Sequence, residues 1–450
     1  MNVFFETIGC RLNEAEIQRW SRDFNDAGHH VVSRVEDAEL VVLNTCAVTA
    51  EASRKSRKLT NRLHRRQPDA ILVLTGCYAE LEPEATTALR GVNLVVNNHD
   101  KDDLLRLIER ELKIPPPLNL AHDGHAIPGK TTGRTRAFVK VQDGCRNRCT
   151  YCIVTIARGE ERSRAIPDVV QEISGLVDRG YRETVLTGVH LGGYGSDQDV
   201  DLTTLVRAIL EDTNVERLRL SSIEPWDVTP DLLSLWQDPI SAAQHPDHGP
   251  RLGAHLHLPL QSGSDRILRR MARRYTAEDF SNTIASARRE IPDVSISTDI
   301  IVGFPGETEN DWAETLTFCE RMGFAHIHIF TYSLREGTVA AGLGDHLSPE
   351  VKRKRSHELH RLAATSRDRH LARFVGTARP VLWEGQGRVT ASGGLQFNGL
   401  TDNYLRCTVE VPASVSLENA ITPVRLDAVA LDGYHGTLSN EVLLSSEIRR

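Results

Sequence analysis

The chain has 450 residues, 26% of them charged, and a formal net charge of −7 at pH 7. This length allows two to four domains with buried cores, and the total charge does not by itself indicate a nucleic-acid partner. The first residues lack a basic segment followed by a long apolar run, and no run of about 18 apolar residues occurs, so neither a signal peptide nor a membrane span is predicted. We therefore expect a cytoplasmic protein whose eight cysteines are reduced and available as ligands.

The first 112 residues repeat one pattern three times: an apolar strand, a short turn, a cysteine and then a helix. Continuous runs of Val, Leu and Ile suit parallel strands that are buried on both faces. Their alternation with helices predicts a doubly wound α/β domain over residues 1–112. The helices are expected over residues 13–27, from after Cys46 through Arg65, and over residues 78–89.

Cys10, Cys46 and Cys77 stand at the carboxyl ends of the three expected strands. Doubly wound sheets bind ligands beyond these ends, so the three cysteines can converge on one site. Each also precedes a helix, whose N-terminal dipole favours a thiolate. One such cysteine could be a small buried hydrophobe, but three at equivalent places favour a metal cluster held by three thiolates.

Two stretches of the chain are strongly basic and lack acidic residues. One is the helix expected after Cys46, which has no acid from Arg54 to Gln67, and the other runs from Arg269 to Arg274. Either a solvated face or contact with phosphates would explain such stretches.

The segment from Pro115 to Thr135 is rich in Pro, Gly, His and Thr, which indicates a linker. Strand and helix patterns then alternate over residues 131–370 and predict a partial (β/α)6 barrel whose active site lies at the carboxyl ends of its strands. The strands are expected over residues 137–141, 183–186, 217–220, 254–258, 294–301 and 327–330. Helices are expected between them, for example over residues 167–179, 202–211, 277–290 and 309–322.

Cys145, Cys149 and Cys152 follow the first of these strands with the spacing CxxxCxxC. Three thiolates can ligate three irons of a 4Fe-4S cluster and leave the fourth iron open. An open iron can be chelated by the amino and carboxylate groups of S-adenosylmethionine (SAM), and this stretch resembles the signature of radical SAM enzymes. A zinc site is the alternative, but structural zinc takes four ligands, and the nearest His or Cys downstream is His190.

The ends of the other strands carry residues that suit a bound cofactor. Glycines permit close approach of the backbone, and the Gln and Ser side chains can form hydrogen bonds. We expect contacts with SAM from Tyr151, Gly188, Gln261, Ser262 and Gly303. Two further cysteines, Cys319 and Cys407, are expected to be core residues.

Over residues 371–450 the pattern changes to short runs of β-branched residues separated by Gly and Asn. These runs predict a small antiparallel β-barrel. Its strands are expected over residues 380–383, 388–391, 404–411 and 424–431. Barrels of this kind commonly bind RNA, but the fold alone does not show it.

Taken together, these motifs resemble the methylthiotransferases over nearly the whole chain. That family joins an N-terminal three-cysteine α/β domain, a radical SAM core and a C-terminal TRAM domain, which would cover residues 1–112, 131–370 and 371–450. The matching motifs are TIGCRLN at residues 7–13, NTC at 44–46, TGCY at 75–78, the loop from Asp143 to Cys152 with ARG at 157–159, HLPLQSGS at 257–264 and VGFPGET at 302–308.

Within the family the chain is most similar to the branch that acts on threonylcarbamoyladenosine at position 37 of tRNA. RLN at residues 11–13 resembles that branch's opening motif, and residues 141–144, 269–275 and 399–404 agree with it. Sister branches act on isopentenyladenosine in tRNA or on an aspartate of a ribosomal protein. A non-enzymatic iron–sulfur protein that binds RNA is the alternative from another class.

The resemblance implies two 4Fe-4S clusters, SAM, a tRNA substrate and an electron donor such as flavodoxin or ferredoxin. The cluster of Cys145, Cys149 and Cys152 would be catalytic: it would cleave SAM reductively to a 5′-deoxyadenosyl radical. The radical would take the hydrogen from carbon 2 of the adenine. The cluster of Cys10, Cys46 and Cys77 would hold the sulfur that another SAM methylates, and this methylthio group would be transferred to carbon 2.

Two segments depart from the family pattern. Val154-Thr155-Ile156 stands where a proline and an aromatic residue are usual, and the Gly-Gly-Glu common after the second barrel strand is absent. Gly188 and His190 occupy that second region, so the contact to the SAM amine has no assigned residue.

Overall fold

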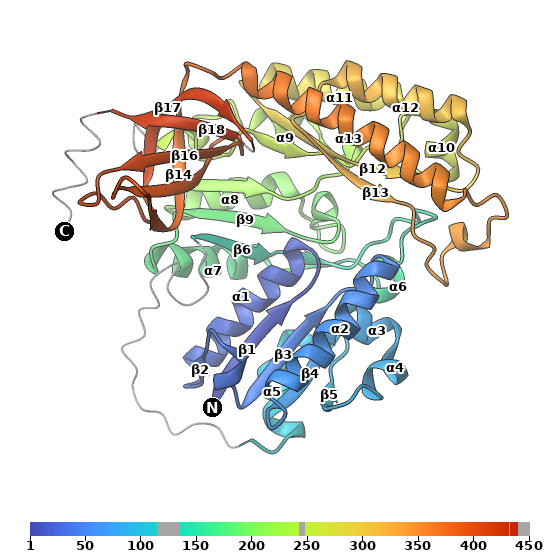
Figure 1. The fold of residues 1–450 in the computed structure, drawn as a ribbon, viewed down its shortest axis with the longest axis vertical. Coiled ribbons are helices and arrows are strands. Elements are labelled where there is room, and N and C mark those ends of the chain that lie inside the picture. The colour runs from blue at the N-terminus through green and yellow to red at the C-terminus, as the bar shows by residue number, and fades with distance from the viewer. Residues whose placement is uncertain (115–134, 243–247, 432, 440–450) are drawn as a thin grey trace.

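The computed structural model describes residues 1–114, 135–242, 248–431 and 433–439. Figure 1 shows three parts in chain order: an N-terminal α/β sheet in blue, a central half-barrel in green to orange, and a C-terminal barrel in red. The predicted fold class is confirmed. The expected linker falls almost wholly outside the described residues. In the part of the chain that the structure describes, no helix is long and apolar enough to cross a membrane.

The N-terminal sheet has five parallel strands in the order β2-β1-β3-β4-β5. Every residue of the central strand β3 is buried, as its continuous apolar run predicts. Separate apolar clusters pack on its two faces, one with α1 and α5 and one with α2. The strands are β1 (Asn2–Thr7), β2 (His30–Val31), β3 (Leu40–Thr45), β4 (Ile71–Gly76) and β5 (Val92–Val95), and the long helices are α1 (Arg11–Asp26), α2 (Ala50–Arg66) and α5 (Leu104–Glu111).

The prediction of a single helix over residues 78–89 is wrong. Two short helices, α3 (Cys77–Leu81) and α4 (Pro83–Thr87), stand there instead. Pro83 has no N–H to continue α3, and it occupies the first turn of α4, where that group has no intrahelical partner.

The central part is a half-barrel built from two three-stranded parallel sheets, β10-β9-β6 and β11-β12-β13. Isolated bridges from Leu218 to Leu252 and from Ser222 to His257 join β10 to the β11 side. All six expected strands are present, with ends shifted by at most one residue. They are β6 (Arg136–Lys140), β9 (Glu183–Thr187), β10 (Arg217–Leu220), β11 (His255–His257), β12 (Ser295–Val302) and β13 (His326–Thr331).

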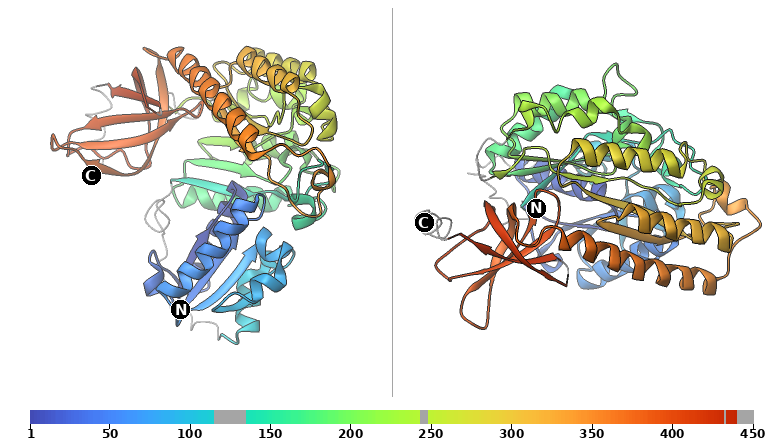
Figure 2. Two further views of the ribbon diagram at one scale, coloured as in Figure 1. Left: turned by 45° about the vertical axis from the view of Figure 1, so that its right-hand side comes forward. Right: turned by 90° about the horizontal axis from the view of Figure 1, so that it is seen from above.

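Helices cover the outer face of the half-barrel, and its open side lies between the edge strands β6 and β13 (Figures 1 and 2). Cys319 lies in the core beneath these helices with no exposed surface, as expected. The helices are α6 (Val154–Arg158), α7 (Ile166–Asp178), α8 (Leu202–Asp212), α9 (Pro230–Ser234), α10 (Asp265–Arg270), α11 (Ala277–Glu290), α12 (Glu309–Met322) and α13 (Pro349–Ala372).

The C-terminal barrel closes in the order β14-β15-β16-β18-β17. The two strands expected over residues 380–383 and 388–391 are one strand, β14, with a bulge between Glu384 and Arg388. The barrel is not wholly antiparallel, because β16 and β18 pair in parallel. Cys407 is buried in its core, as expected. The strands are β14 (Ala378–Val389), β15 (Leu395–Thr401), β16 (Arg406–Val411), β17 (Ile421–Ala430) and β18 (Gly433–Leu438).

The three parts meet around the open side of the half-barrel. Helix α1 of the N-terminal part lies along β6, where the Gln18 side chain accepts a hydrogen bond from the backbone N–H of Phe138 (2.8 Å). The C-terminal barrel contributes its β15–β16 turn, whose Asp402 carbonyl accepts a hydrogen bond from Arg219 on β10 (2.8 Å). Figure 2 shows the N-terminal sheet and the barrel on neighbouring sides of this opening.

Candidate active site

The CxxxCxxC loop lies between two short strands that follow β6, namely β7 (Gln142–Asp143) and β8 (Arg162–Ser163). The backbone N–H of Cys145 donates to the carbonyl of Gly159 (3.0 Å), and the N–H of Cys152 donates to the carbonyl of Cys149 (3.0 Å). Gly144 has a φ of +75°, and a Cβ there would lie 1.9 Å from the Glu160 carbonyl oxygen. The start of the loop therefore requires glycine.

The loop brings its three thiols together. Burial raises the pKa of Cys152 to about 12, and the neighbouring charges of Cys149 and Cys145 add to the effect. Burial likewise raises the pKa of Cys145 to about 11. At Cys145 and Cys152 a bound metal would replace the thiol proton, which is the usual coupling between metal binding and ligand deprotonation.

Arg273 is a functional candidate that the sequence placed in an exposed basic stretch. The structure corrects this, because Arg273 is only 6% exposed and its Nη1 donates to the Cys149 sulfur (3.4 Å). Its guanidinium is paired with the Glu224 carboxylate, and it lies 4.8 Å from the centroid of the Trp226 ring. These contacts hold a cation against one of the three sulfurs.

A chain of three polar side chains lies beside Cys145. His190 Nδ1 is 2.7 Å from Glu161 Oε1, and His190 Nε2 is 2.7 Å from Asp227 Oδ2. The ligand atoms of Cys145, Glu161 and His190 lie within 4.8 Å of one another, although His190 is far from Cys145 in sequence. Distance along the chain was therefore a poor argument against zinc. The stronger argument is that carboxylates already engage both ring nitrogens of His190.

We expect the replacement His190→Asn to destabilise the protein more at pH 6 than at pH 9. Burial opposes a charge on His190, but Asp227 and Glu161 outweigh it and raise the His190 pKa. A raised histidine pKa gives stability that is complete below the unfolded value of about 6.5 and is lost as pH rises through the folded value. The loss at pH 6 should be about 1.5–3 kcal/mol, as for hydrogen bonds to charged groups.

Anaerobic denaturant unfolding of both proteins at the two pH values measures this difference. His357→Asn, at an exposed position of α13, is the control. Equal losses at both pH values would show that His190 is neutral in the folded protein.

The second set of cysteines gathers where the N-terminal sheet faces the half-barrel. Cys10 precedes α1, Cys46 follows β3, and Cys77 begins α3. Gly9 packs on Cys46: it has a φ of +125°, and a Cβ there would lie 2.8 Å from the Cys46 Cβ. Burial raises the pKa of Cys46 to about 12, with contributions from the charges of Cys77 and Cys10. At Cys46, burial therefore outweighs the thiolate-favouring helix dipole expected from the sequence.

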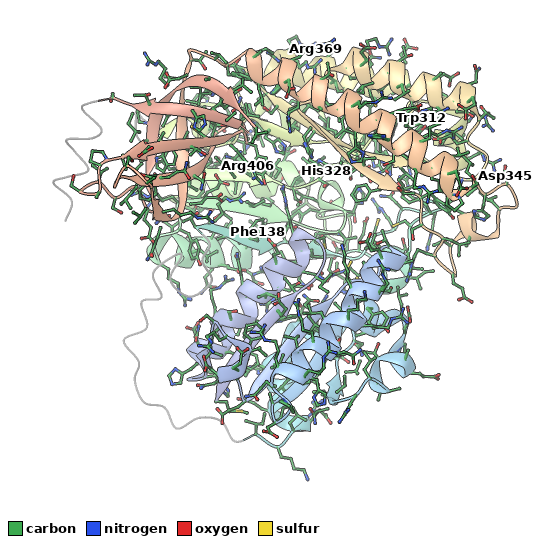
Figure 3. The ribbon with its side chains drawn as sticks, viewed as in Figure 1. Phe138, Trp312, His328, Asp345, Arg369 and Arg406 are labelled. Atoms are coloured by element: carbon green, nitrogen blue, oxygen red, sulfur yellow. The ribbon has the colours of Figure 1, made fainter. Side chains whose placement is uncertain are left out.

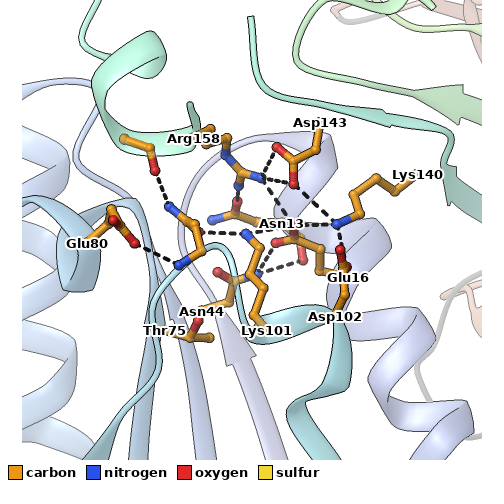
Figure 4. A network of polar contacts seen from close by, with 12 residues as sticks. Asn13, Glu16, Asn44, Thr75, Glu80, Lys101, Asp102, Lys140, Asp143 and Arg158 are labelled. Carbon is orange, nitrogen blue, oxygen red and sulfur yellow. Dashed lines mark hydrogen bonds and ion pairs between the residues drawn. The ribbon is translucent and has the colours of Figure 1, made fainter. Parts of the chain in front are cut away.

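A buried polar network connects the two cysteine sets (Figure 4). Its centre is Arg158 at the end of α6, whose Nη1 lies 3.1 Å from Glu16 Oε1 and 3.1 Å from Asp143 Oδ1. Its Nη2 donates to Asn13 Oδ1 (2.9 Å), which lies 3.8 Å from the Cys10 sulfur. Burial would raise the pKa of Glu16, but Lys101, Arg158 and Lys140 hold it at about 2.

Asn13 and Glu16 belong to the first turns of α1, directly after Cys10, and Asp143 lies two residues before Cys145. The Arg158 side chain is 2% exposed, so these ion pairs are shielded from solvent. The network therefore fixes the position of one cysteine set relative to the other.

Three of the five residues expected to contact SAM lie around the loops at the strand ends. Tyr151 is partly buried and packs on a cluster that includes Met271 and Phe304. Gly188 follows β9, and a Cβ there would lie 2.9 Å from Gln142 Oε1. Gln261 has a φ of +70°, and its N–H donates to the Asp299 carbonyl (2.7 Å).

The other two, Ser262 and Gly303, take part in packing between elements. Ser262 has no exposed surface, and its hydroxyl lies 3.2 Å from that of Thr315 on α12. Gly303 has a φ of +74°, and a Cβ there would lie 2.6 Å from Cγ of Lys352 on α13. In this structure their residue types are explained by helix packing.

The two basic stretches differ in the structure. On α2 the cations are exposed, and beside them lies a shallow groove of about 740 Å³ that is lined by Glu6, Thr7, Ile8, Lys55, Lys58, Leu59, Asn61, Arg62 and Arg65. In the second stretch, Arg273 is buried and Arg270 pairs with Asp345 (2.9 Å). Acids distant in sequence therefore neutralise much of the second stretch.

Comparisons with known proteins agree with this architecture. Residues 2–97 match a family described as "Uncharacterized protein family UPF0004", and residues 139–319 match the "Radical SAM superfamily". In fold, the chain is similar to the radical SAM methyltransferase TsrM from Kitasatospora setae, with a TM-score of 0.56, 15% identity, and coverage of 76% of this chain and 77% of that one.

Two curated relatives span almost the whole chain. "Threonylcarbamoyladenosine tRNA methylthiotransferase MtaB" of Bacillus subtilis is 35% identical over 90% of this chain and 89% of its own length. "tRNA-2-methylthio-N(6)-dimethylallyladenosine synthase" of Syntrophobacter fumaroxidans is 35% identical over 98% of this chain and 95% of its own length.

The half-barrel, its three-thiol loop and these matches define the class, which is that of radical SAM enzymes using SAM and a 4Fe-4S cluster. Within that class, the chain belongs to the tRNA methylthiotransferase family.

Proposed function

We propose that the protein transfers a methylthio group to carbon 2 of N6-threonylcarbamoyladenosine at position 37 of tRNA. The observation that carries this proposal is the presence of two three-cysteine sets joined by one buried network. The chain that contains them has relatives from four bacteria, at 34–36% identity, that are named for this nucleoside. Dimethylallyladenosine, which is the isopentenyladenosine named above, is the second candidate, because relatives named for it are 31–35% identical. Anaerobic assays on tRNA carrying one or the other nucleoside separate the two.

We assign the radical SAM cluster to Cys145, Cys149 and Cys152. The three thiols are grouped on one loop, and the Arg273 cation against the Cys149 sulfur fits a negatively charged iron–sulfur–thiolate site. When bound, the cluster and SAM supply a reductively generated radical that can remove a hydrogen atom from an aromatic carbon, where ordinary acid–base chemistry does not suffice. Tyr151, Gly188, Gln261, Ser262 and Gly303 stay our proposed SAM contacts, the last two in addition to their packing roles.

We assign a second 4Fe-4S cluster to Cys10, Cys46 and Cys77. Three thiols from three different strand ends lie together, and the Arg158 charge opposes the rise in the Cys46 pKa. A buried cation beside three thiols is suited to balance the charge of a thiolate-ligated cluster. As with the first set, three ligands would leave one iron open, in this case for the sulfur that is transferred.

The residues around the clusters would position the substrate and exclude water, while the cofactors would supply the difficult chemistry. An electron donor such as flavodoxin or ferredoxin would reduce the radical cluster. Because its proposed substrate is tRNA, we propose that the protein acts in the cytoplasm. The domain limits that we propose are residues 1–112, 131–370 and 371–450.

We expect the fourfold Ala replacement of Lys55, Arg57, Lys58 and Arg62 to weaken tRNA binding and reduce its salt dependence. These α2 side chains are exposed, and the helix begins shortly after Cys46, so they can contact phosphates that flank the target base. Each lost phosphate contact should flatten the log–log salt slope by roughly 0.7–0.9.

Measuring tRNA affinity across a salt series provides the test. The matched control removes four exposed cations of α13, namely Arg353, Lys354, Arg361 and Arg369, and should keep the wild-type slope. SAM cleavage without tRNA should survive in both variants. If the α2 variant keeps the wild-type affinity and slope, the basic face of α2 is only a solvated surface.

A further inference from the structure

Arg11 is a cation at the meeting point of all three parts of the molecule. It is the first residue of α1, directly after Cys10, and its Nη2 donates to the Tyr404 hydroxyl (2.8 Å). Tyr404 belongs to the β15–β16 turn of the C-terminal barrel, and its ring is stacked on His255 of β11 with the ring centroids 4.6 Å apart. Arg11 therefore reaches from the proposed sulfur cluster to the open side of the half-barrel.

Three arginines surround Tyr404, but only Arg11 keeps an unneutralised charge. Arg136 pairs with Glu384 (2.8 Å), and Arg219 pairs with Glu183 (2.8 Å). For Arg11, no carboxylate lies within 4.0 Å among the residues that the structure describes. A half-buried guanidinium without an acid partner is a ready site for an anion.

The wall that faces Arg11 is polar and, among its described residues, carries a single acid. On β11, β12 and β13, His257 Nε2 lies 3.1 Å from Asp299 Oδ1, so the one acid there is already engaged. His328 of β13 is exposed; Figure 3 labels it at one edge of the opening and Phe138 of β6 at the other. Although its side chain keeps exposed surface, the partial burial of His328, the charges of His326 and His257 and, to a smaller extent, the Arg11 charge lower the His328 pKa to about 4.

An aromatic ring is also available on this wall. Phe330 lies two residues beyond His328 on β13, so it is on the same face of the strand, and 46% of its surface is exposed. Nucleic-acid bases stack readily on exposed aromatic side chains. The opening thus offers a stacking surface and, toward the Cys10 side, a free cation.

The candidate nucleosides differ in what they would present to that cation. In threonylcarbamoyladenosine the threonine is attached through its nitrogen and keeps a free carboxylate, whereas a dimethylallyl group is a hydrocarbon. We propose that Arg11 binds the carboxylate of the threonyl group on the target adenosine and makes the site specific for adenosines that carry one. This inference rests on the proposed function and adds a specificity-determining residue to it.

The test measures affinities of the anaerobically reconstituted protein for three RNA hairpins that differ only at the target adenosine: one threonylcarbamoylated, one unmodified, and one with the threonyl carboxylate as its methyl ester. We expect wild type to prefer the first hairpin to the ester by at least about tenfold, the range of a charge-assisted hydrogen-bond pair. Arg11→Gln should abolish this preference and leave the affinity for the unmodified hairpin within about twofold. Arg11→Lys should keep part of the preference.

Arg19→Gln, on the same helix but paired with Asp23, is the matched control and should behave as wild type. Equal losses for all three hairpins in Arg11→Gln would mean that Arg11 contacts a tRNA phosphate, and an unchanged preference would mean that it contacts no anion; either result overturns the inference. The comparison of the first hairpin with its ester uses wild type alone, so a folding defect in Arg11→Gln cannot hide whether the carboxylate is recognised. Arg11→Lys, which keeps the charge, then tests Arg11 itself. If wild type fails to methylthiolate the first hairpin at all, the proposed function fails, which is a separate result.

Discussion

Replacing Cys10, Cys46 and Cys77 together with alanine is expected to abolish methylthio transfer and leave reductive SAM cleavage intact. The three thiols belong to the N-terminal sheet, whereas the CxxxCxxC loop belongs to the half-barrel. Losing the first set should therefore remove the proposed sulfur site without touching a ligand of the radical cluster. Iron should fall from about eight to about four atoms per chain, as expected for the loss of one of two cubane clusters.

The measurements are iron content, 5′-deoxyadenosine formation and methylthio nucleoside formation on the same anaerobic samples. The replacement of Cys319, a core residue of the half-barrel, with alanine is the control, because it removes a cysteine and should keep both clusters. Loss of SAM cleavage in a folded triple variant would refute the division of labour between the two sets.

The second large effect is expected from Cys149→Ala, which should abolish 5′-deoxyadenosine formation. The radical cluster would lose one of only three protein ligands, and Arg273 would lose the sulfur to which it donates. The replacement Arg273→Met keeps all three thiols and removes that hydrogen bond and the ion pair with Glu224. It also removes the hydrogen bonds to the Tyr275 hydroxyl and the Pro259 carbonyl and the contact with the Trp226 ring. It should therefore retain iron and show slower cleavage, since partners of metal ligands typically contribute 10–100-fold.

The test measures 5′-deoxyadenosine formation under strong chemical reduction in wild type and both variants. Iron content is measured on the same samples. Near-normal cleavage by Cys149→Ala would contradict the assignment of this loop as the radical site. The same loss of iron in both variants would indicate that Arg273 is required for cluster assembly.

The sequence predicted the fold well where apolar strands are long and buried. All three cysteine-terminated strands of the first sheet and all six strands of the half-barrel were expected, because burial on both faces requires continuous apolar runs. The misses include short or interrupted elements and two uninterrupted strands of the C-terminal barrel, β15 and β18, which the sequence pattern did not predict. Strand β2 has only two residues, and the Gly-containing bulge of β14 made one strand resemble two.

The sequence predicted those parts of the candidate site that depend on the positions of residues along the chain. Cysteine positions relative to strand ends gave both three-thiol sets, since the ends of parallel strands meet at one edge. Contacts between residues that are distant in the sequence left no such pattern. Arg273 is paired with Glu224 from another loop. His190 contacts Glu161 and Asp227 from two further segments. One signal was available, because Arg158 lies in the Ala-Arg-Gly motif that the sequence singled out without assigning it a role.

The most direct measurement of the central claim is mass spectrometry of tRNA nucleosides from a strain in which the gene for this protein is deleted. We expect 2-methylthio-N6-threonylcarbamoyladenosine to disappear, N6-threonylcarbamoyladenosine to accumulate in its place, and the wild-type gene to restore the methylthio nucleoside. The gene carrying Cys149→Ala should not restore it. Persistence of that nucleoside in the deletion strain, with loss of the methylthio derivative of isopentenyladenosine instead, would contradict the proposed substrate.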